Sequence, residues 1–278
     1  MKKQIISIAF LMGTLITLSV LLYPFAANYV NSRSQTRVVT RYIDDVAVID
    51  DGSRKAILEA ARAYNRELLG NADRFRPTEK EKKAYLGQLD AGRGVMGILV
   101  IDKIDVNLPI YHGTDEGVLQ VGIGHLEGTS LPVGGMGTHA FITGHRGLPS
   151  SKLLSNLDKL AEGDTFALYI MGETLTYLVD RIQTVEPHDV EALDIDPDMD
   201  HCTLVTCTPY GINTHRLLVR GHRVENAAIV GWSAVYADAK RLDKLLVIAL
   251  FMIPAFPAIL LSAIAACVKI YKKGKMKP

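Results

Sequence analysis

The stretch CTLVTCTPYGINTHRLLVRGHR, residues 202–223, joins two strand-like runs through a turn and holds two of the chain's three cysteines. TLVTC is apolar and rich in β-branched residues, and RLLVRGH continues in the same way, so both runs are typical of β-strands. Thr-Pro-Tyr-Gly between them is a turn signal. If the two strands pair as neighbours, Cys207 at the end of the first lies close to Arg216 at the start of the second.

Similar strand-like runs precede this stretch, beginning at about Val95. They are GILVIDKIDVNLPIYHG, HAFITGH, TFALYI and TLTYLVDRIQTV. Gly-rich turns such as LPVGGMGT separate them, and Met-Gly-Glu between the last two runs predicts a hairpin. LLSNLDKL, residues 153–160, is the one short helix that we expect in this region. Short strands in succession with little helix between them favour a barrel or a sandwich.

The region before the strands has a different pattern. A polar connector follows residue 30, and a helix should then begin, capped by Ser53 and closed by Gly70. Apolar residues recur in it at helical spacing, namely Ile57, Ala61, Tyr64 and Leu68. Residues 71–94, NADRFRPTEKEKKAYLGQLDAGRG, are highly charged, and we expect them to form an exposed loop.

Residues 4–32 and 245–268 contain no charged side chain. Each is long enough to cross a bilayer as a helix, which takes about 20 apolar residues. Lys2 and Lys3 precede the first stretch, and five lysines follow the second: Lys269, Lys272, Lys273, Lys275 and Lys277. Because positive residues stay cytoplasmic, we expect two spans in the cell membrane, both termini cytoplasmic and the intervening region extracellular. A cleaved signal peptide is the alternative for the first span, although the apolar run is long for one.

The region between the two spans is acidic, although the whole chain has a formal net charge of +1. No acidic residue lies before Asp44 or after Asp243, so this region holds all 30 acidic residues. Seven of the 31 basic residues lie outside it, which leaves 24 inside and a net charge of −6. A nucleic-acid backbone needs a basic face, and we therefore expect no nucleic-acid partner.

The three cysteines do not form the pattern of a disulfide framework. Cys267 lies in the second uncharged stretch as a small apolar residue. Cys202 and Cys207 are five residues apart, and an odd separation on a strand puts side chains on opposite faces. A bridge between them is therefore disfavoured. A zinc site of Cys202, Cys207 and His201 lacks the usual spacing, and we expect no metal and no cofactor.

Cys207 lies at the end of a strand, where a thiol can meet a ligand. Only the thiolate attacks, and a free cysteine has a pKa of about 8.5, so a nucleophilic cysteine needs a base or a cation beside it. His145 in FITGHRG also ends a strand before a turn. The fixed charge of Arg216 could hold an oxyanion or favour the thiolate. A second interpretation stays open: a buried small residue, a surface histidine and a rim arginine.

TLVTC ending at Cys207, TGH ending at His145 and an arginine nine residues after the cysteine resemble the active site of the sortases. These are membrane-anchored cysteine transpeptidases of Gram-positive bacteria. The resemblance covers residues 94–224 and implies a mainly β fold, the eight-stranded sortase barrel with short helices. It makes Cys207 the nucleophile, His145 the acid/base and Arg216 the oxyanion or substrate-orienting residue. Two further arginines are of the right type but do not match the family position, Arg220 and Arg223.

Three features resemble class C, the pilin-polymerising sortases. They are the second uncharged stretch with its basic tail, the helical region before the barrel, and NADRF. NADRF resembles the lid of that class, a loop with an aspartate, usually a proline, and an aromatic residue that plugs the active site. Asp73 and Phe75 would be the lid residues, whereas Arg74 stands where proline is usual. An arginine frees the backbone that a proline would fix, so the plug would be looser.

The resemblance also implies a reaction. Cys207 would attack the Thr–Gly carbonyl of an LPXTG-like signal on a pilin or another surface protein. The thioacyl enzyme would then pass to an acceptor amine, from a pilin lysine or from peptidoglycan. Membrane lipid would hold enzyme and substrate together. The alternatives are a housekeeping sortase that anchors surface proteins to the cell wall, a hydrolytic cysteine peptidase, and a membrane-tethered binding domain without turnover.

These expectations divide the chain into five parts. They are an N-terminal membrane anchor (1–32), an extracellular helix and lid-like loop (33–93), the catalytic barrel (94–224), a membrane-proximal linker (225–244), and a second transmembrane helix with a basic tail (245–278).

Overall fold

The computed structural model describes residues 2–189 and 193–226. The expected second span and basic tail, and nearly all of the expected linker, lie outside these residues. The chain divides into two units: residues 28–233 form one, and residues 1–27 with 234–278 form the other. Of the second unit, the structure describes residues 2–27.

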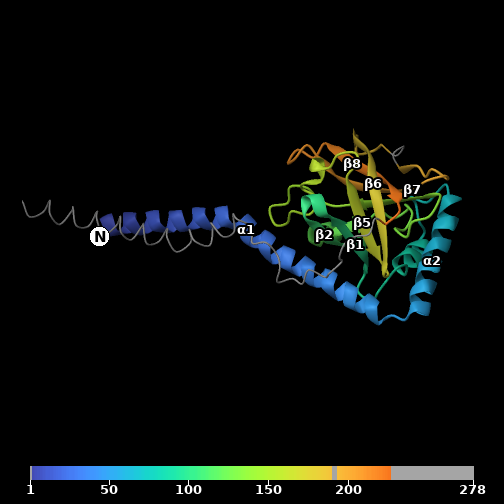
Figure 1. Cartoon of the computed structure of the whole chain (residues 1–278). Helices are drawn as coiled ribbons and strands as arrows, with labels where there is room; N and C mark the ends of the chain where they lie inside the picture. Colours follow the sequence, from blue (N-terminus) through green and yellow to red (C-terminus); the bar gives the residue numbers. More distant parts are fainter. Residues whose placement is uncertain (1, 190–192, 227–278) are drawn as a thin grey trace, which may run out of the picture. The chain divides into compact units, whose positions relative to one another are not determined.

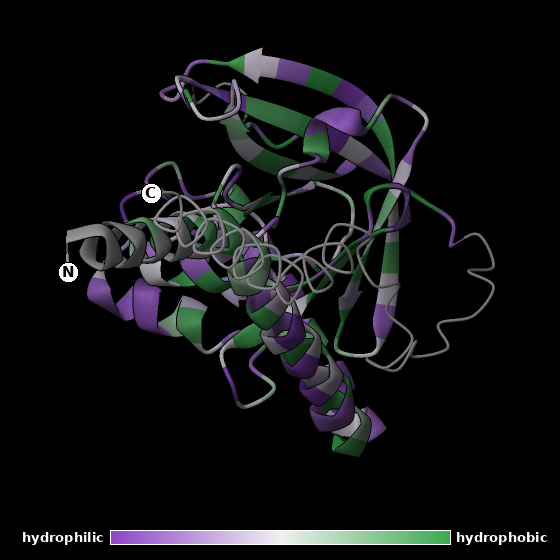
Figure 2. Ribbon diagram, turned by 90° about the vertical axis from the view of Figure 1, so that its left-hand side faces the viewer, coloured by the Kyte–Doolittle hydropathy of each residue, from purple (hydrophilic) through white to green (hydrophobic). Residues whose placement is uncertain are grey.

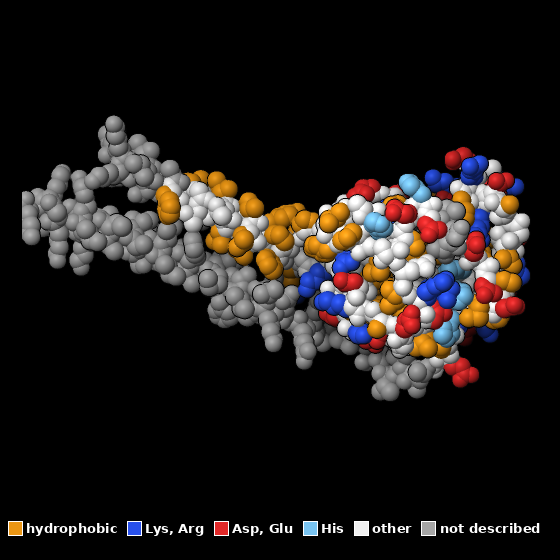
Figure 3. Space-filling view, turned by 90° about the horizontal axis from the view of Figure 1, so that it is seen from above, with side chains coloured by type: hydrophobic (Ala, Val, Ile, Leu, Met, Phe, Trp, Pro, Cys, Tyr) orange, Lys and Arg blue, Asp and Glu red, His pale blue; other side chains and the backbone are white. Residues whose placement is uncertain are grey.

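The chain begins with the helix α1 (Lys2–Val48). Its stretch from Met12 is long and apolar enough to cross a membrane, by length and composition. Hydrophobic side chains gather along its exposed surface (Figure 3). The polar stretch that follows is not the separate connector that we expected, because it continues the same helix. It lacks Gly and Pro, and buried residues recur in it at helical spacing: Val39, Tyr42 and Val46.

The second helix, α2 (Asp51–Leu69), flanks one side of the barrel (Figure 1). Ser53 is not its cap. Asp50 takes that position, and its carboxylate accepts a hydrogen bond from the Ser53 backbone N–H at 3.0 Å. Gly70 ends the helix, as predicted. The buried face of α2 consists of Leu58, Ala61, Asn65 and Leu68.

The charged segment 71–94 is not the exposed loop that we expected, because it contains the helix α3 (Glu79–Leu86). Thr78 and Glu81 form a capping box at its start. Two residues of the segment, Tyr85 and Leu89, are fully buried, and the Tyr85 hydroxyl lies 3.0 Å from His125 Nδ1. A few buried contacts therefore dock a segment that is otherwise charged and exposed.

Eight strands form a closed barrel in the order β1-β2-β3-β4-β7-β8-β6-β5, which confirms the predicted eight-stranded fold (Figure 1). Their bounds are β1 Val95–Ile101, β2 Val106–His112, β3 Ile123–His125, β4 Thr138–Thr143, β5 Thr165–Ile170, β6 Glu173–Val185, β7 Asp200–Thr208 and β8 His215–Val224. The β5–β6 hairpin lies where Met-Gly-Glu predicted it.

Short helices connect some strands. They are η1 (Asp102–Ile104), α4 (Glu116–Val121) and η2 (Leu157–Lys159). The helix expected over residues 153–160 is only the 3-10 turn η2, because the backbone leaves the helical region on both sides of it, at Asn156 (φ −102°, ψ 11°) and at Leu160 (φ −74°, ψ 149°). Neither α4 nor the three-residue strand β3 was predicted.

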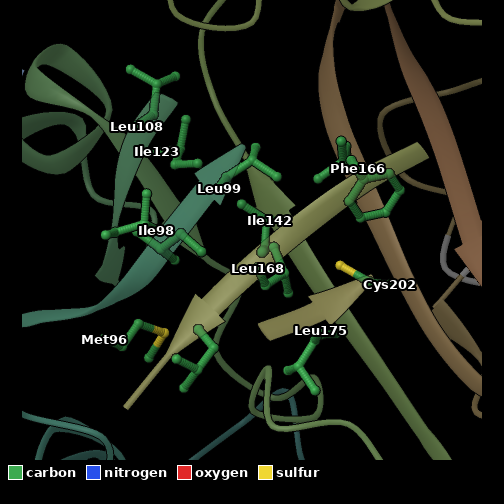
Figure 4. Packing of buried hydrophobic residues seen from close by; sticks show 14 of the residues in the cluster. Met96, Ile98, Leu99, Leu108, Ile123, Ile142, Phe166, Leu168, Leu175 and Cys202 are labelled. Carbon is green, nitrogen blue, oxygen red and sulfur yellow. The ribbon is translucent and has the colours of Figure 1, made fainter. Parts of the chain in front are cut away.

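Hydrophobic and hydrophilic residues alternate along parts of the strands (Figure 2), and the hydrophobic ones fill the barrel. Ile98, Leu168 and Ile142 meet there from different strands, and the Cys202 thiol lies among them (Figure 4). Cys202 is therefore a core residue. Its burial raises the pKa of the thiol well above its usual range, which makes the thiol a poor nucleophile.

Candidate active site

A row of three residues, His145, Cys207 and Arg216, comes from the ends of three neighbouring segments: the chain after β4, the end of β7 and the start of β8. Cys207 is opposite Arg216 in the antiparallel β7–β8 ladder. β4 and β7 are parallel and pair Thr143 with Val205. His145 follows two residues after that pair, beyond the end of β4. Directly paired residues project from the same side of a sheet, so the side chains of Cys207 and Arg216 share one face.

This face is the outside of the barrel. Cys202 and Leu204 point into the core, and Cys207, an odd number of residues away, is partly exposed on the other side. Both cysteines are free, as their predicted opposite orientation requires. The zinc alternative is wrong for the same reason, because Cys202 faces away from Cys207.

The segment before His145 is fixed by close contacts. The Gly144 N–H donates to the Val205 carbonyl at 3.1 Å, and the Thr206 hydroxyl donates to the Gly144 carbonyl at 2.8 Å. A Cβ at Gly144 would lie 2.6 Å from Ile123 Cγ2, so only glycine fits. These contacts tie the end of β4 to the end of β7 and fix the backbone from which His145 projects.

The imidazole of His145 is 26 % exposed. Its Nε2 is buried and makes no hydrogen bond within the described residues. The Glu116 Oε2 atom on α4 lies 3.6 Å from it, which is within ion-pair range but longer than a hydrogen bond. Sequence reasoning missed Glu116, because no motif or spacing connects it to His145.

The Arg216 guanidinium contacts backbone oxygens of the turn beside it. Its Nη1 donates to the carbonyls of His215 at 3.2 Å and Asn213 at 3.4 Å. No carboxylate forms an ion pair with Arg216 among residues 2–189 and 193–226, so its charge stays available to an anionic group. Arg220, by contrast, donates through Nε and Nη2 to Asp180 at 3.0 and 3.3 Å.

The same outer face continues away from Cys207 into a cavity of about 230 Å³. Its lining includes Thr203, Leu218, Arg220, His139 and His201. Burial lowers the pKa of His139 to about 4, and both of its nitrogens are engaged, with the Asp194 carbonyl at 2.8 Å and the Thr203 hydroxyl at 2.7 Å. Histidine side chains lie at the surface beside acidic and basic ones (Figure 3).

Asp73 and Phe75 lie in the turn between α2 and α3. Phe75 is 41 % exposed and packs on Gly128, where a Cβ would lie 2.7 Å from the Phe75 ring. Arg74 lies over that ring, 4.9 Å from its centroid, and donates to the Leu193 carbonyl at 3.0 Å. Within the part of the chain that the structure describes, no hydrogen bond joins Asp73 to Cys207.

No group of three or more His, Cys, Asp or Glu residues in the described ranges is placed to hold a metal ion. The row itself carries a partly exposed thiol, an imidazole and a guanidinium. Together these groups can attack a carbonyl, move a proton and hold a developing oxyanion. That chemistry defines a class of enzyme, the cysteine-dependent acyl transferases and hydrolases.

Comparison with known proteins identifies the family. The Sortase domain matches residues 99–224. A crystal structure of sortase C1 from Streptococcus agalactiae is 50 % identical, with a TM-score of 0.66, and the match covers 69 % of this chain and all of that one. A sortase C structure from Streptococcus pneumoniae is 40 % identical, with a TM-score of 0.60, over 68 % of this chain and 97 % of that one. The chain belongs to the sortase family, whose members are cysteine transpeptidases.

A curated relative, sortase A from Streptococcus agalactiae serotype III, is 34 % identical over 117 residues, which is 41 % of this chain and 47 % of the relative. Sortase D from Bacillus subtilis is 28 % identical over 131 residues, 46 % of this chain and 63 % of the relative. The chain thus spans about half to under two thirds of the curated relatives it matches, whereas it covers the sortase C structures almost completely.

Proposed function

We propose that this chain is a class C sortase that cleaves an LPXTG-like sorting signal and joins pilin subunits by isopeptide bonds. The observation that carries the proposal is the pairing of Cys207 with Arg216 on the outer face of the barrel, with His145 just past the end of the neighbouring strand β4. Its similarity to sortase C structures supports the class. The Streptococcus pneumoniae sortase C structure is described as providing insights into pilin substrate specificity.

The proposed reaction has two halves. The Cys207 thiolate attacks the Thr–Gly carbonyl, and Arg216 holds the oxyanion that forms. The S–C bond forms, the C–N bond breaks, and protonated His145 gives its proton to the leaving amine. A lysine amine of the next pilin then attacks the thioacyl carbonyl, releases Cys207 and returns a proton to His145.

We also propose that Asp73 and Phe75 belong to a lid over the substrate groove. The segment is seated on Gly128 and held by Arg74 at the Leu193 carbonyl, in the connection before β7. A proline at position 74 could not donate that bond, so Arg74 gives this lid a polar attachment in place of a stiff backbone. A lid mutant is among the solved relatives, in sortase A from Corynebacterium diphtheriae.

The proposed location is the outer side of the cell membrane. The apolar part of α1 would serve as one anchor, and residues 245–268 as a second, with both termini cytoplasmic. Anchoring would keep the barrel near membrane-held pilins and raise their effective concentration.

The test is intact-mass analysis of the full chain in detergent micelles, mixed with an LPXTG-type peptide. We expect a thioacyl adduct on the wild type and on Cys202→Ala, and none on Cys207→Ala. Phe75→Ala should carry more adduct, because the lid is open. A folded wild type and lid variant that both stay free of adduct would contradict the proposal.

The molecule that releases the thioacyl adduct distinguishes a pilin polymerase from a housekeeping sortase and from a peptidase. A peptide with the acceptor lysine of a pilin should release the adduct as an isopeptide product. Release by a peptidoglycan amine alone would indicate a housekeeping sortase. Release by water alone would indicate a peptidase.

A further inference from the structure

The carboxylate that approaches His145 belongs to a helix that no motif predicted. Glu116 Oε2 lies 3.6 Å from the buried His145 Nε2. The Glu116 side chain is 72 % exposed and can therefore rotate to close the small gap to a hydrogen bond. Active-site hydrogen bonds are often long before substrate binds, so the distance is compatible with a working pair.

The orientation of Glu116 is partly fixed by its own helix. Its Oε1 accepts a hydrogen bond from Gln120 Nε2 one turn further on, which leaves Oε2 to face His145. The neighbouring carboxylate, Asp115, caps no backbone group through its side chain and forms no ion pair with His145 in the described ranges.

A contact from α1 holds the two segments that bring this pair together. The buried amide of Gln35 donates to the Val121 carbonyl at the end of α4, at 3.1 Å, and to the Ser151 hydroxyl at 3.2 Å. Ser151 lies in the loop that follows His145. α1 therefore braces both the helix that carries Glu116 and the loop beyond the histidine.

We propose that Glu116 is the acidic partner of His145, a positioning residue that orients the imidazole and stabilises its protonated form. The role of His145 in this inference rests on the proposed function. Glu116 exchanges no proton, and its negative charge favours the ring that donates to the leaving amine. The row holds two further groups that can carry charge, the Cys207 thiol and the Arg216 guanidinium.

The arginine next to His145 is paired with a different carboxylate. Arg146, the next residue in the chain, is neutralised by Asp158 at 2.6 Å. Glu116 is therefore the carboxylate that forms an ion pair with the imidazole of His145 in the described part of the chain.

The test compares Glu116→Gln with Asp115→Asn in the full chain in detergent, because both remove one charge from the same end of α4. The first readout is the rate at which iodoacetamide alkylates Cys207 across pH, followed by peptide mapping. We expect Glu116→Gln to slow alkylation at neutral pH about two- to fivefold, the range of a partly exposed ion pair, and to move its rise to higher pH. Asp115→Asn should match the wild type.

The second readout is acyl transfer from the sorting peptide. Glu116→Gln should lower kcat by a similar factor with KM unchanged, and should move the basic limb of the pH profile to lower pH. A wild-type alkylation profile in Glu116→Gln, an equal effect of Asp115→Asn, or a change in KM alone would overturn the proposal. Alkylation needs no sorting signal, so it decides the role of Glu116 even if the peptide does not react.

Discussion

The two ends of the outer β4–β7–β8 face carry the same kinds of residue in different states. At the end near Cys207, and within residues 2–189 and 193–226, His145 Nε2 makes no hydrogen bond and Arg216 bonds only backbone carbonyls. At the far end, both nitrogens of His139 are engaged, and Arg220 is held by two bonds from Asp180.

The difference separates groups that are ready for substrate from groups that hold the fold. Buried polar groups in proteins are almost always hydrogen-bonded. Within the described residues the buried His145 Nε2 is an exception, and it is the atom that Glu116 approaches. His201 at the far end also has an open Nε2, but its side chain is only 5 % exposed, against 26 % for His145. The greater exposure of His145 and, among the described residues, the unpaired Arg216 support the near end as the proposed site.

The sharpest test of this comparison exchanges one histidine at each end. We expect His145→Ala to lower kcat/KM for thioacyl formation by about 10²–10⁴-fold, the contribution of a general acid or base, with little change in stability. His139→Gln should keep near-normal kcat/KM and lower the free energy of unfolding by about 1–3 kcal/mol, because buried hydrogen bonds are lost. Peptide kinetics and denaturant unfolding of both variants give the answer. Equal losses of activity in two folded variants would remove the distinction between the ends.

The arginines allow the same comparison. Arg216→Lys keeps the charge but loses the planar fork, and we expect kcat to fall about 10²-fold, as when an oxyanion donor is removed. Arg220→Lys should instead lower the free energy of unfolding by about 1–2 kcal/mol, because the paired bonds to Asp180 are broken, with kcat near that of the wild type. If Arg220→Lys loses more activity than Arg216→Lys, then the far end holds the oxyanion.

Acid should weaken the far end. Burial lowers the pKa of His139 from 6.5 to about 4. Between these pH values the unfolded chain binds a proton that the folded chain does not, so stability is complete above pH 6.5 and falls as the pH drops toward 4. One pKa unit is about 1.4 kcal/mol, so the loss from this residue is about 3 kcal/mol.

The measurement is the free energy of unfolding at pH 7.5 and 4.5 for the wild type and His139→Gln, in denaturant. The variant should lose less stability by nearly that amount. His125, whose pKa burial also lowers to about 4, contributes equally to both proteins. Parallel losses in the two proteins would show that His139 is not the titrating group.

Much of the barrel could be predicted from the sequence, because its long strands are rich in β-branched residues and are separated by turn signals. The opposite orientation of Cys202 and Cys207 followed from strand geometry alone. The three-residue strand β3 could not be predicted, since it is too short to show a period. α3 was hidden by its charge, because the buried Tyr85 and Leu89 are few among many exposed residues.

The candidate site shows a similar limit. TLVTC predicted that Cys207 lies near the end of a strand, because the motif is local, and β7 ends one residue after it. TGH predicted a strand that ends at His145, but β4 ends two residues earlier, at Thr143. Glu116 and Gln35 could not be predicted, since each acts across distant segments that only the folded chain brings together. Asp50 replaced Ser53 as the cap of α2 for a local reason: both are good capping residues, and the sequence alone does not rank them.

The smallest effect that we expect comes from Gln35 on α1, which links the end of α4 to the loop after His145. Gln35→Leu removes the amide nitrogen that donates both hydrogen bonds and leaves the Val121 carbonyl without this partner, so the free energy of unfolding should fall by about 1–2 kcal/mol. kcat should fall more than KM changes, because Glu116 and His145 lose their common support. Gln88→Leu is the matched control, since among the described residues the Gln88 side chain bonds only a carbonyl of its own turn, Ala84, at 3.4 Å. If Gln35→Leu loses stability but keeps its kcat, then α1 supports the fold without positioning the site, and the openness of the near end is set by β4 and β7 alone.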